Sequence, residues 1–380
     1  MLFRSDLLMR VAGKSIVAPS MLVAALAAVV RAVAQAKNAP VPADVPESAI
    51  DANAKAIATS LASGKNAAVW LGNLAQHHPA ASQLHWLAQQ LAGLLGARFG
   101  FLGEAANSVG GYLAGSVPRS GSGLNARQML AQPRKAYVLL GVEPELDAYD
   151  SAQAEAAMKQ AEFVVALSPY QHHALDYAHA LLPVAPFTET SGTFVNTEGR
   201  AQSFNGVVLP LAETRPAWKG LRVLGNLAGL AGFDYDSSEA VRKDALGDGS
   251  IAPQLDNALS SKPQGGTDAP VAGVQRIGEV SIYQTDAVVR RAAALQKTRD
   301  GGHPVATLAG GLFDKLGMRE GDSVRITMGA NTAVLLAQRD EKLSADCVRV
   351  PAGHPATAGL GALFGGVMLE RVASAQKVVV

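Results

Sequence analysis

Three short apolar runs, separated by stretches with helical periodicity, constrain the fold of this chain most strongly. The runs occupy residues 67–72, 135–141 and 162–168, and helices are predicted over 80–95 and 152–161. Continuous apolar strands that alternate with helices indicate a mostly parallel sheet, because such a sheet is covered by helices on both faces. The sequence therefore predicts an α/β fold, in which ligands usually bind at the carboxyl ends of the strands.

The composition changes twice along the 380 residues. Residues 237–273 are rich in Asp, Ser, Gly and Pro, which is typical of a linker. Beyond residue 300, short turn-separated runs predict strands of a small β-barrel-like module, at 323–328, 332–338, 347–350 and 367–372. The predicted organisation is an α/β region over 1–236, a linker with a helical segment over 237–300, and the β-barrel-like module over 301–380.

The most apolar run, residues 21–30, contains ten residues. A helix needs ~20 predominantly apolar residues to cross a bilayer. Ser20, which follows Pro19, is a candidate helix N-cap, and alanine dominates the sequence from there to Asn38. We therefore predict an alanine-rich helix that packs within the protein, with no direct insertion into a membrane.

Charge and cysteine content exclude several classes of protein. The 33 Lys and Arg residues balance 32 Asp and Glu residues, and the net charge of +1 gives no reason to expect nucleic acid as a partner. The single cysteine, Cys347, excludes an internal disulfide, a cysteine-based zinc site and a four-thiolate iron–sulfur cluster. Cys347 lies in a predicted strand, where a small buried residue is favoured over a nucleophile.

Two glycine motifs lack the context that phosphate binding requires. Gly13-Lys14-Ser15 ends like a P-loop, but Leu8 stands where that motif needs glycine. The stretch 121–126 matches the dinucleotide pattern G-x-G-x-x-A, yet the clear strand follows it instead of preceding it. An ordinary glycine-rich loop is the favoured interpretation.

His172, Asp176 and His179 have the spacing that places three metal ligands on one helical face. Pro169 and Pro183 bracket the segment closely and leave little room for such a helix. Solvated or locally hydrogen-bonded histidines are therefore favoured, and the sequence predicts neither a metal site nor a catalytic constellation.

The most distinctive stretch is residues 181–202, in which two prolines precede two glycine turns. Glycines permit close approach of the backbone to another group, and the polar side chains between them lie close together. The stretch fits either a ligand-lining loop or a structural corner tied by Glu and Arg, and spacing leaves both open. The residues concerned are Glu189, Gly192, Thr193, Asn196, Glu198, Gly199 and Arg200.

The pattern E-x-x-G-T-F-x-N-x-E-G-R from Glu189 to Arg200 resembles the molybdopterin oxidoreductase superfamily. More closely, together with residues 213–224 and 281–291, it resembles the large iron–sulfur subunit of bacterial NADH–quinone oxidoreductase, respiratory complex I. The resemblance covers most of residues 15–300, and the segment 316–324 resembles the C-terminal β-barrel module of the superfamily.

This resemblance implies a C-terminal scaffold part of such a subunit, whose intact form relays electrons from NADH toward quinone. The family carries its iron–sulfur clusters on N-terminal cysteines that have no counterpart here, so we expect a truncated chain that holds no cofactor of its own. The implied partners are other subunits of the complex I peripheral arm, at the cytoplasmic side of the bacterial inner membrane. The alternatives are a fragment of a molybdopterin-dependent oxidoreductase that binds a pterin near Gly192 and Asn196, or an independent binding module.

Overall fold

The computed structural model describes residues 10–103, 105–118, 123–259, 263, 271–298 and 300–372. The chain divides into two compact units, each assembled from separate stretches of sequence. Unit 1 comprises Met1–Leu102, Asn257–Thr285 and Ala292–Val380, and unit 2 comprises Gly103–Asp256 and Asp286–Arg291. The predicted segments 1–236 and 237–300 each contribute to both units, whereas 301–380 lies in unit 1.

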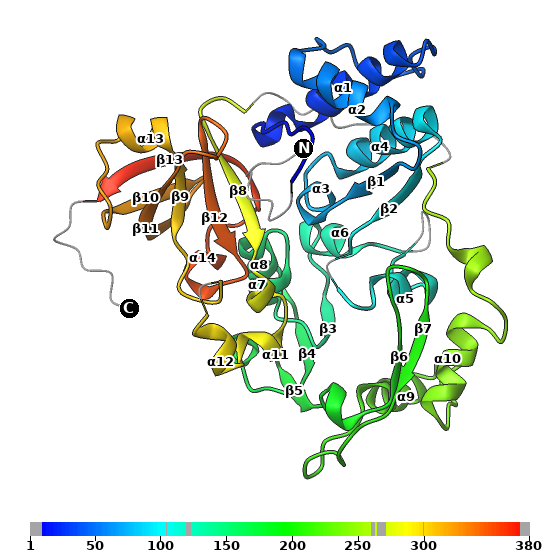
Figure 1. Cartoon of the computed structure of the whole chain (residues 1–380). Coiled ribbons are helices and arrows are strands. Elements are labelled where there is room, and N and C mark those ends of the chain that lie inside the picture. Colours follow the sequence, from blue (N-terminus) through cyan, green and yellow to red (C-terminus); the bar gives the residue numbers. More distant parts are fainter. Residues whose placement is uncertain are drawn as a thin grey trace. The chain divides into compact units, whose positions relative to one another are not determined.

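Unit 1 contains a closed six-stranded barrel (Figure 1). Its strands follow one another around the barrel in the order β10, β11, β9, β12, β8, β13. The β9–β11 and β8–β12 pairs are parallel and the other pairs are antiparallel. The strands are β8 Val274–Val280, β9 Ala306–Ala309, β10 Ser323–Met328, β11 Asn331–Asp340, β12 Cys347–Ala352 and β13 Phe364–Val372. The predicted barrel is confirmed, and it also takes in β8, from the segment predicted as linker and helix.

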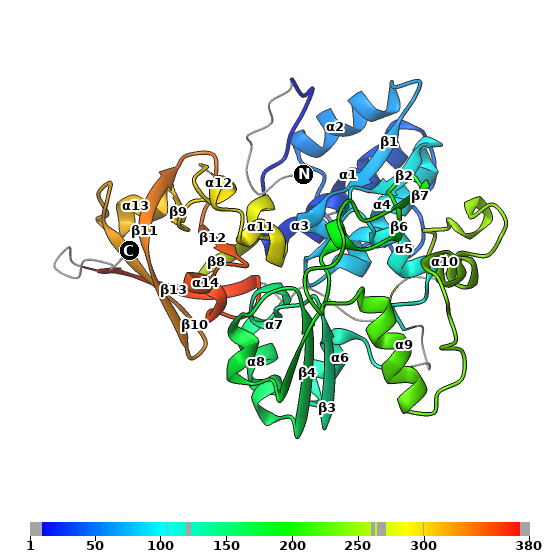
Figure 2. The ribbon, with the colours of Figure 1, turned by 90° about the horizontal axis from the view of Figure 1, so that it is seen from below.

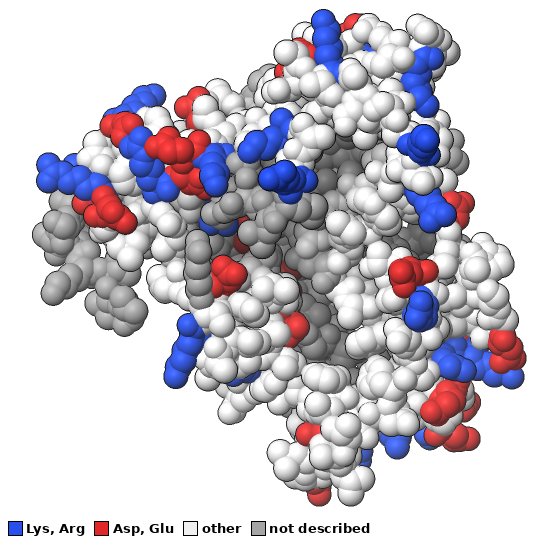
Figure 3. Space-filling view, viewed as in Figure 1, with Lys and Arg blue, Asp and Glu red and all other residues white. Residues whose placement is uncertain are grey.

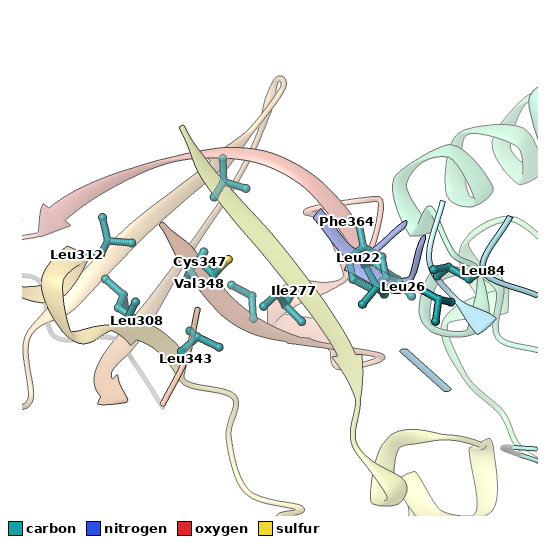
Figure 4. Close-up of a cluster of buried hydrophobic side chains, with 14 of the residues drawn as sticks. Leu22, Leu26, Leu84, Ile277, Leu308, Leu312, Leu343, Cys347, Val348 and Phe364 are labelled. Carbon is teal, nitrogen blue, oxygen red and sulfur yellow. The ribbon is translucent and has the colours of Figure 1, made fainter. Parts of the chain in front are cut away.

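A continuous hydrophobic core joins the barrel to the first helices of unit 1. Figure 4 shows barrel residues such as Leu308, Val348 and Ile277 together with Leu22, Leu26 and Leu84 from the helices. The helices are η1 Pro19–Met21, α1 Leu22–Ala36, α2 Ala52–Ala62, α3 Asn73–Gln76 and α4 Ala81–Leu95. Short helices complete this unit: η5 Ile282–Gln284, α12 Ala293–Gln296, α13 Gly310–Lys315 and α14 Pro355–Ala358.

Helix α1 is the predicted alanine-rich helix. Within the part of the chain that the structure describes, Pro19–Ala36 is the one helical stretch long and apolar enough to cross a membrane, and 56% of it is buried inside the protein. The predicted cap is wrong, because Ser20 lies in the short 3₁₀ turn before α1 and Met21 occupies the N-cap position. Ser20 instead exchanges two hydrogen bonds with Gln275 of β8, at 3.0 and 2.9 Å.

The first predicted strand pairs in a two-stranded parallel sheet. β1 Ala68–Leu71 lies beside β2 Arg98–Phe101, which the sequence pattern did not predict, and α4 packs against both. The expectation of a buried strand is wrong for Trp70, which is 53% exposed. Its ring lies over Gly100 on the partner strand, where a side chain would collide with it.

Unit 2 is built on a three-stranded parallel sheet in the order β3, β4, β5. The strands are β3 Ala136–Leu140, β4 Phe163–Ser168 and β5 Ala180–Pro183. Helices α6 Ala126–Ala131 and α8 Ser151–Gln160 share a core with β3 and β4 (Figure 2). The predicted parallel α/β arrangement is confirmed.

The remaining elements of unit 2 lie beyond this sheet. Strands β6 Gly192–Val195 and β7 Ala201–Phe204 form an antiparallel hairpin. Helix α10 Ser238–Leu246 forms within the predicted linker, capped by the Ser237 hydroxyl. The linker prediction is therefore wrong for these residues. The other elements are α5 Ser108–Leu113, α7 Pro144–Asp147, η2 His173–Asp176, η3 Phe187–Glu189, α9 Ala217–Leu227, η4 Ala252–Gln254 and α11 Ala287–Arg290.

Charged side chains of both signs are interspersed on the face of the molecule in Figure 3. Uncharged residues form most of the described surface in this view. This distribution agrees with the nearly balanced composition of the chain.

Candidate functional site

The distinctive stretch around residues 189–200 forms the β6–β7 hairpin and its approach. The carboxylate of Glu189 accepts a hydrogen bond from the backbone N–H of Leu211 at 2.8 Å. Thr193 and Ser203 share a hydroxyl–hydroxyl hydrogen bond of 3.0 Å across the hairpin. These two motif side chains therefore hold neighbouring backbone and the opposite strand.

Asn196 organises the turn of the hairpin. Its side-chain oxygen accepts hydrogen bonds from the backbone N–H groups of Glu198, at 3.1 Å, and Arg200, at 2.9 Å. The side chains of Glu198 and Arg200 form an exposed ion pair of 3.6 Å. Such an Asx-type turn explains why asparagine stands at this position.

Steric constraints inside the protein explain why glycine occupies positions 192 and 199 of the motif. A Cβ atom on Gly192 would lie 2.7 Å from the ring of Phe204, its cross-strand partner. Gly199 has φ +80°, in the left-handed region, and a Cβ there would collide with Leu255. Close packing within unit 2 therefore accounts for both glycines.

A pterin dinucleotide near Gly192 and Asn196 needs polar groups that face the ligand. The described polar side chains of the motif have protein partners instead, and the glycines are covered by Phe204 and Leu255. The seven motif residues thus do not fit a pterin site in this arrangement, and we derive no chemical step through such a group.

The candidate metal ligands do not converge. His172 caps η2 by accepting the N–H of Ala174, and His179 accepts the N–H of Val164 at 3.0 Å. Asp176 pairs with His173, three residues before it in the chain. Among the described residues, no group of three or more His, Cys, Asp or Glu side chains could hold a metal ion.

Cys347 lies fully buried in the barrel wall. Burial raises the pKa of its thiol to about 11. A thiol that stays protonated and inaccessible at neutral pH is a poor nucleophile. This agrees with its interpretation as a small core residue.

Four charged side chains, two of them almost fully buried, come together at the carboxyl ends of β3 and β4. We name Glu143, Asp147, Arg290 and Arg291 the arginine–carboxylate cluster. Glu143 contacts Arg290 through Oε2 at 2.7 Å and Arg291 through Oε1 at 2.5 Å, and Arg290 also pairs with Asp147. The side chains of Glu143 and Arg290 are only 3% and 6% exposed.

Local structure fixes both halves of this cluster. Glu143 precedes α7, and its backbone N–H donates to the Asp147 carboxylate at 2.7 Å. Arg290 ends the single turn of α11, whose N-terminus is capped by the Asp286 carboxylate. The guanidinium of Arg291 lies over the ring of Tyr170, 4.7 Å from its centroid.

The electrostatics of the cluster favour its charged form. Burial alone would raise the pKa of the Glu143 carboxyl, but hydrogen bonds from Arg291 and Arg290 outweigh it and lower the pKa. Burial alone would lower the pKa of Arg290, whereas Asp147 and Glu143 raise it. Two guanidinium groups and two carboxylates therefore neutralise one another inside unit 2.

A second buried carboxylate lies next to this cluster. The Tyr177 hydroxyl donates to Oε2 of Glu145 at 3.0 Å, and both residues are buried. Burial and the Glu145 carboxylate raise the pKa of Tyr177, so the phenol stays protonated. Glu145 thus accepts from a neutral donor, in contrast with Glu143, whose donors are two guanidinium groups.

Sequence reasoning missed the arginine–carboxylate cluster. The one local signal is Glu143 and Asp147, four residues apart, directly after the predicted strand 135–141. Their arginine partners lie more than 140 residues away. The cluster can hold loops together and neutralise charge, and it occupies the sheet edge where ligands of α/β folds usually bind.

Part of the chain is similar to a known protein family. Residues 44–227 match the family model described as "Molybdopterin oxidoreductase". A stretch of 82 residues, 22% of the chain, is 33% identical to proteins named "Putative formate dehydrogenase" in Staphylococcus aureus strains USA300 and NCTC 8325. That stretch spans only 8% of the length of those relatives.

Among solved structures, acetylene hydratase from Pelobacter acetylenicus is similar with a TM-score of 0.47 and 15% sequence identity. The similarity covers 70% of this chain and 50% of that one. The matched residues 44–227 run from the connector before α2 to the end of α9 and include the parallel sheet of unit 2. Residues 44–227, which belong partly to unit 1 and partly to unit 2, are thus similar to the molybdopterin oxidoreductase family.

Proposed function

We propose that this chain is part of a molybdopterin-dependent oxidoreductase. The match of residues 44–227 to the family model carries the proposal. The similarity of 82 residues to proteins named formate dehydrogenase supports redox chemistry. Because the motif residues 189–200 are engaged within unit 2, a pterin group would be held by residues other than these seven.

The test is the composition of the protein purified from its native source with an affinity tag on this chain. We expect molybdenum in stoichiometric amount, measured by mass spectrometry, and a fluorescent pterin derivative after oxidation. Absence of both from a preparation that retains its partner chains would contradict the proposal. A tagged preparation of the Glu189→Gln variant is the matched control. In the parent chain the Glu189 carboxylate binds the backbone of Leu211 and contacts no proposed ligand, so this variant should contain as much molybdenum and pterin as the parent.

The second candidate is a scaffold part of the large iron–sulfur subunit of complex I, at the cytoplasmic side of the bacterial inner membrane. Two observations favour it: the pattern from Glu189 to Arg200 and the segment 281–291 resemble that subunit, and the motif residues need no ligand to explain them. In this case the intact subunit relays electrons from NADH toward quinone through iron–sulfur clusters held outside this chain, and its partners are other subunits of the peripheral arm.

The same purification separates the two candidates. A complex I scaffold predicts iron and acid-labile sulfide without molybdenum, together with NADH-dependent reduction of a quinone analogue. Molybdenum and pterin without that activity would contradict the second candidate and support the first. The two proposals thus predict opposite outcomes in one preparation.

A further inference from the structure

Arg290 and Arg291 direct their guanidinium groups at a single carboxylate. Nη1 of Arg290 lies 2.7 Å from Oε2 of Glu143, and Nη2 of Arg291 lies 2.5 Å from Oε1. Nη1 of Arg291 adds a third contact to Oε2, at 3.3 Å. Proteins bind phosphate and carboxylate ligands with this arrangement, in which N–H donors from two guanidinium groups surround one anion.

The position of this arginine pair matches that of a ligand site. Glu143 follows the end of β3, and Tyr170, on which Arg291 stacks, follows the end of β4. In parallel α/β sheets, ligands bind outside the carboxyl ends of the strands. The side chain of Arg291 is 32% exposed, so an anion from solvent could reach its guanidinium if the carboxylate were absent.

The charge balance makes Glu143 the decisive residue. Asp147 also neutralises Arg290, whereas Arg291 contacts the Glu143 carboxylate within the four-residue cluster. Removal of Glu143 would leave one positive charge in excess within the cluster. Arg290 is buried and Arg291 is partly exposed, so this excess charge is incompletely solvated and favours binding of an external anion in place of the carboxylate.

We propose that Arg290 and Arg291 form an anion-binding site whose resident anion is the Glu143 carboxylate. The native chain thereby closes this edge of the sheet to phosphate-bearing ligands, and loss of the carboxylate opens it to them. This inference goes beyond the proposed function and does not depend on it, since it concerns only residues of unit 2.

The test uses the full chain with Glu143→Ala and inorganic phosphate as the probe. Trp218 is the only one of the three tryptophans in unit 2, so a Trp70→Phe, Trp86→Phe background reports on this unit by fluorescence. Urea unfolding is compared in phosphate and in chloride of equal ionic strength. We expect E143A to be destabilised in chloride and restored by phosphate in a saturable manner. At a phosphate concentration of 100 times Kd, the unfolding constant should fall about 100-fold.

Three controls define the site. The unmodified Glu143 chain should show no phosphate effect beyond that of chloride, and Glu143→Ala with Arg291→Ala should lose the restoration. Glu145→Ala removes a neighbouring buried carboxylate that accepts from the Tyr177 hydroxyl, and phosphate should not restore it. Equal responses to phosphate and chloride in E143A, or restoration that survives loss of Arg291, would overturn the proposal.

A variant that does not fold in chloride still gives a result. E143A purified in phosphate should keep its native Trp218 emission and lose it on dialysis into chloride. If unit 2 of E143A is unfolded in both buffers, the proposal is wrong. Molybdenum and pterin content have no part in these measurements, so failure here is distinguishable from failure of the proposed function.

Discussion

The barrel of unit 1 and the parallel sheet of unit 2 bury their apolar side chains to different degrees. In the barrel, Leu308, Ile326 and Leu335 are at most 1% exposed. In the sheet, Val138 and Phe163 are 59% and 49% exposed, although parallel sheets are usually covered on both faces. Closure of the barrel leaves no unpaired edge among its described strands, and its core continues into helices α1 and α4 of the same unit.

Buried charge joins the strand ends of the unit 2 sheet to another segment of the same unit. Helices α6 and α8 share a core with β3 and β4, and Gly220 of α9 lies close to Leu167. The arginine–carboxylate cluster ties the strand ends of this sheet to the segment Asp286–Arg291. We infer that hydrophobic burial dominates the stability of the barrel and that ion pairs contribute a larger share in unit 2.

The largest expected effect is that of Arg290→Met. Methionine is similar in length to the methylene part of the arginine side chain but has no guanidinium, so Asp147 loses its ion-pair partner. Breaking a buried ion pair costs about 3–5 kcal/mol, and we expect this loss in the urea unfolding of unit 2 followed by Trp218. Arg291→Met is the matched control and should cost less, because its side chain is one-third exposed. Equal unfolding of R290M and the parent chain would refute the importance of the cluster.

The next effect is that of Leu308→Ala in the barrel. Truncation of a fully buried leucine costs about 2–5 kcal/mol, through lost burial and the cavity left behind. The loss should appear in unfolding followed by Trp70 and Trp86 in a Trp218→Phe background, since both lie in unit 1. Leu336→Ala, on an exposed side of the same barrel, is the control and should change stability little. An equal loss for both variants would mean that barrel closure is not what stabilises this unit.

A smaller effect is expected for Asn196→Ala in the hairpin of unit 2. The variant removes the acceptor of two backbone hydrogen bonds, and each such bond contributes about 1 kcal/mol. Asn196→Asp keeps an acceptor and should retain most of the stability. If N196A unfolds like the parent chain, the structural explanation of the motif fails and a ligand-lining role regains support.

The smallest perturbation is chemical labelling of Cys347 in the native chain. Burial raises the pKa of the thiol to about 11, from an ordinary value of 9.0. At pH 8 the reaction with a thiol reagent should be at least ~100-fold slower than in the unfolded chain, because the thiolate is the reactive form. Labelling should be faster in the Leu308→Ala variant, because Leu308 and Cys347 belong to the same core. It should stay slow in the Arg290→Met variant, because Arg290 lies in unit 2. Rapid labelling of the native chain would show that the barrel opens readily.

The sequence predicted the elements with strong local patterns. Strand β10 begins and ends where the predicted strand 323–328 does, and α4 differs by one residue from its prediction. Strand β2 was missed because its four residues, Arg98–Phe101, carry no continuous apolar run and depend on pairing with β1.

The candidate site was less accessible to sequence reasoning. The spacing of Glu189 to Arg200 marked a stretch with many specific contacts but could not show that their partners lie within unit 2. The cluster around Glu143 joins residues far apart in the chain, and only the tertiary fold brings Arg290 and Arg291 to this strand end. Side-chain chemistry alone does not reveal such a pairing.

The most direct test of the difference between the units is hydrogen exchange of the full chain as pH is lowered from 7 to 3. The pKa of Glu143 is lowered by folding, so its stabilisation is complete above the ordinary value of 4.5 and is lost as pH falls through the lower folded value. After correction for intrinsic rates, peptides from β3 and β4 should lose protection first, while those from β10 and β12 stay protected. Loss of protection in the barrel before or together with the sheet would contradict this account.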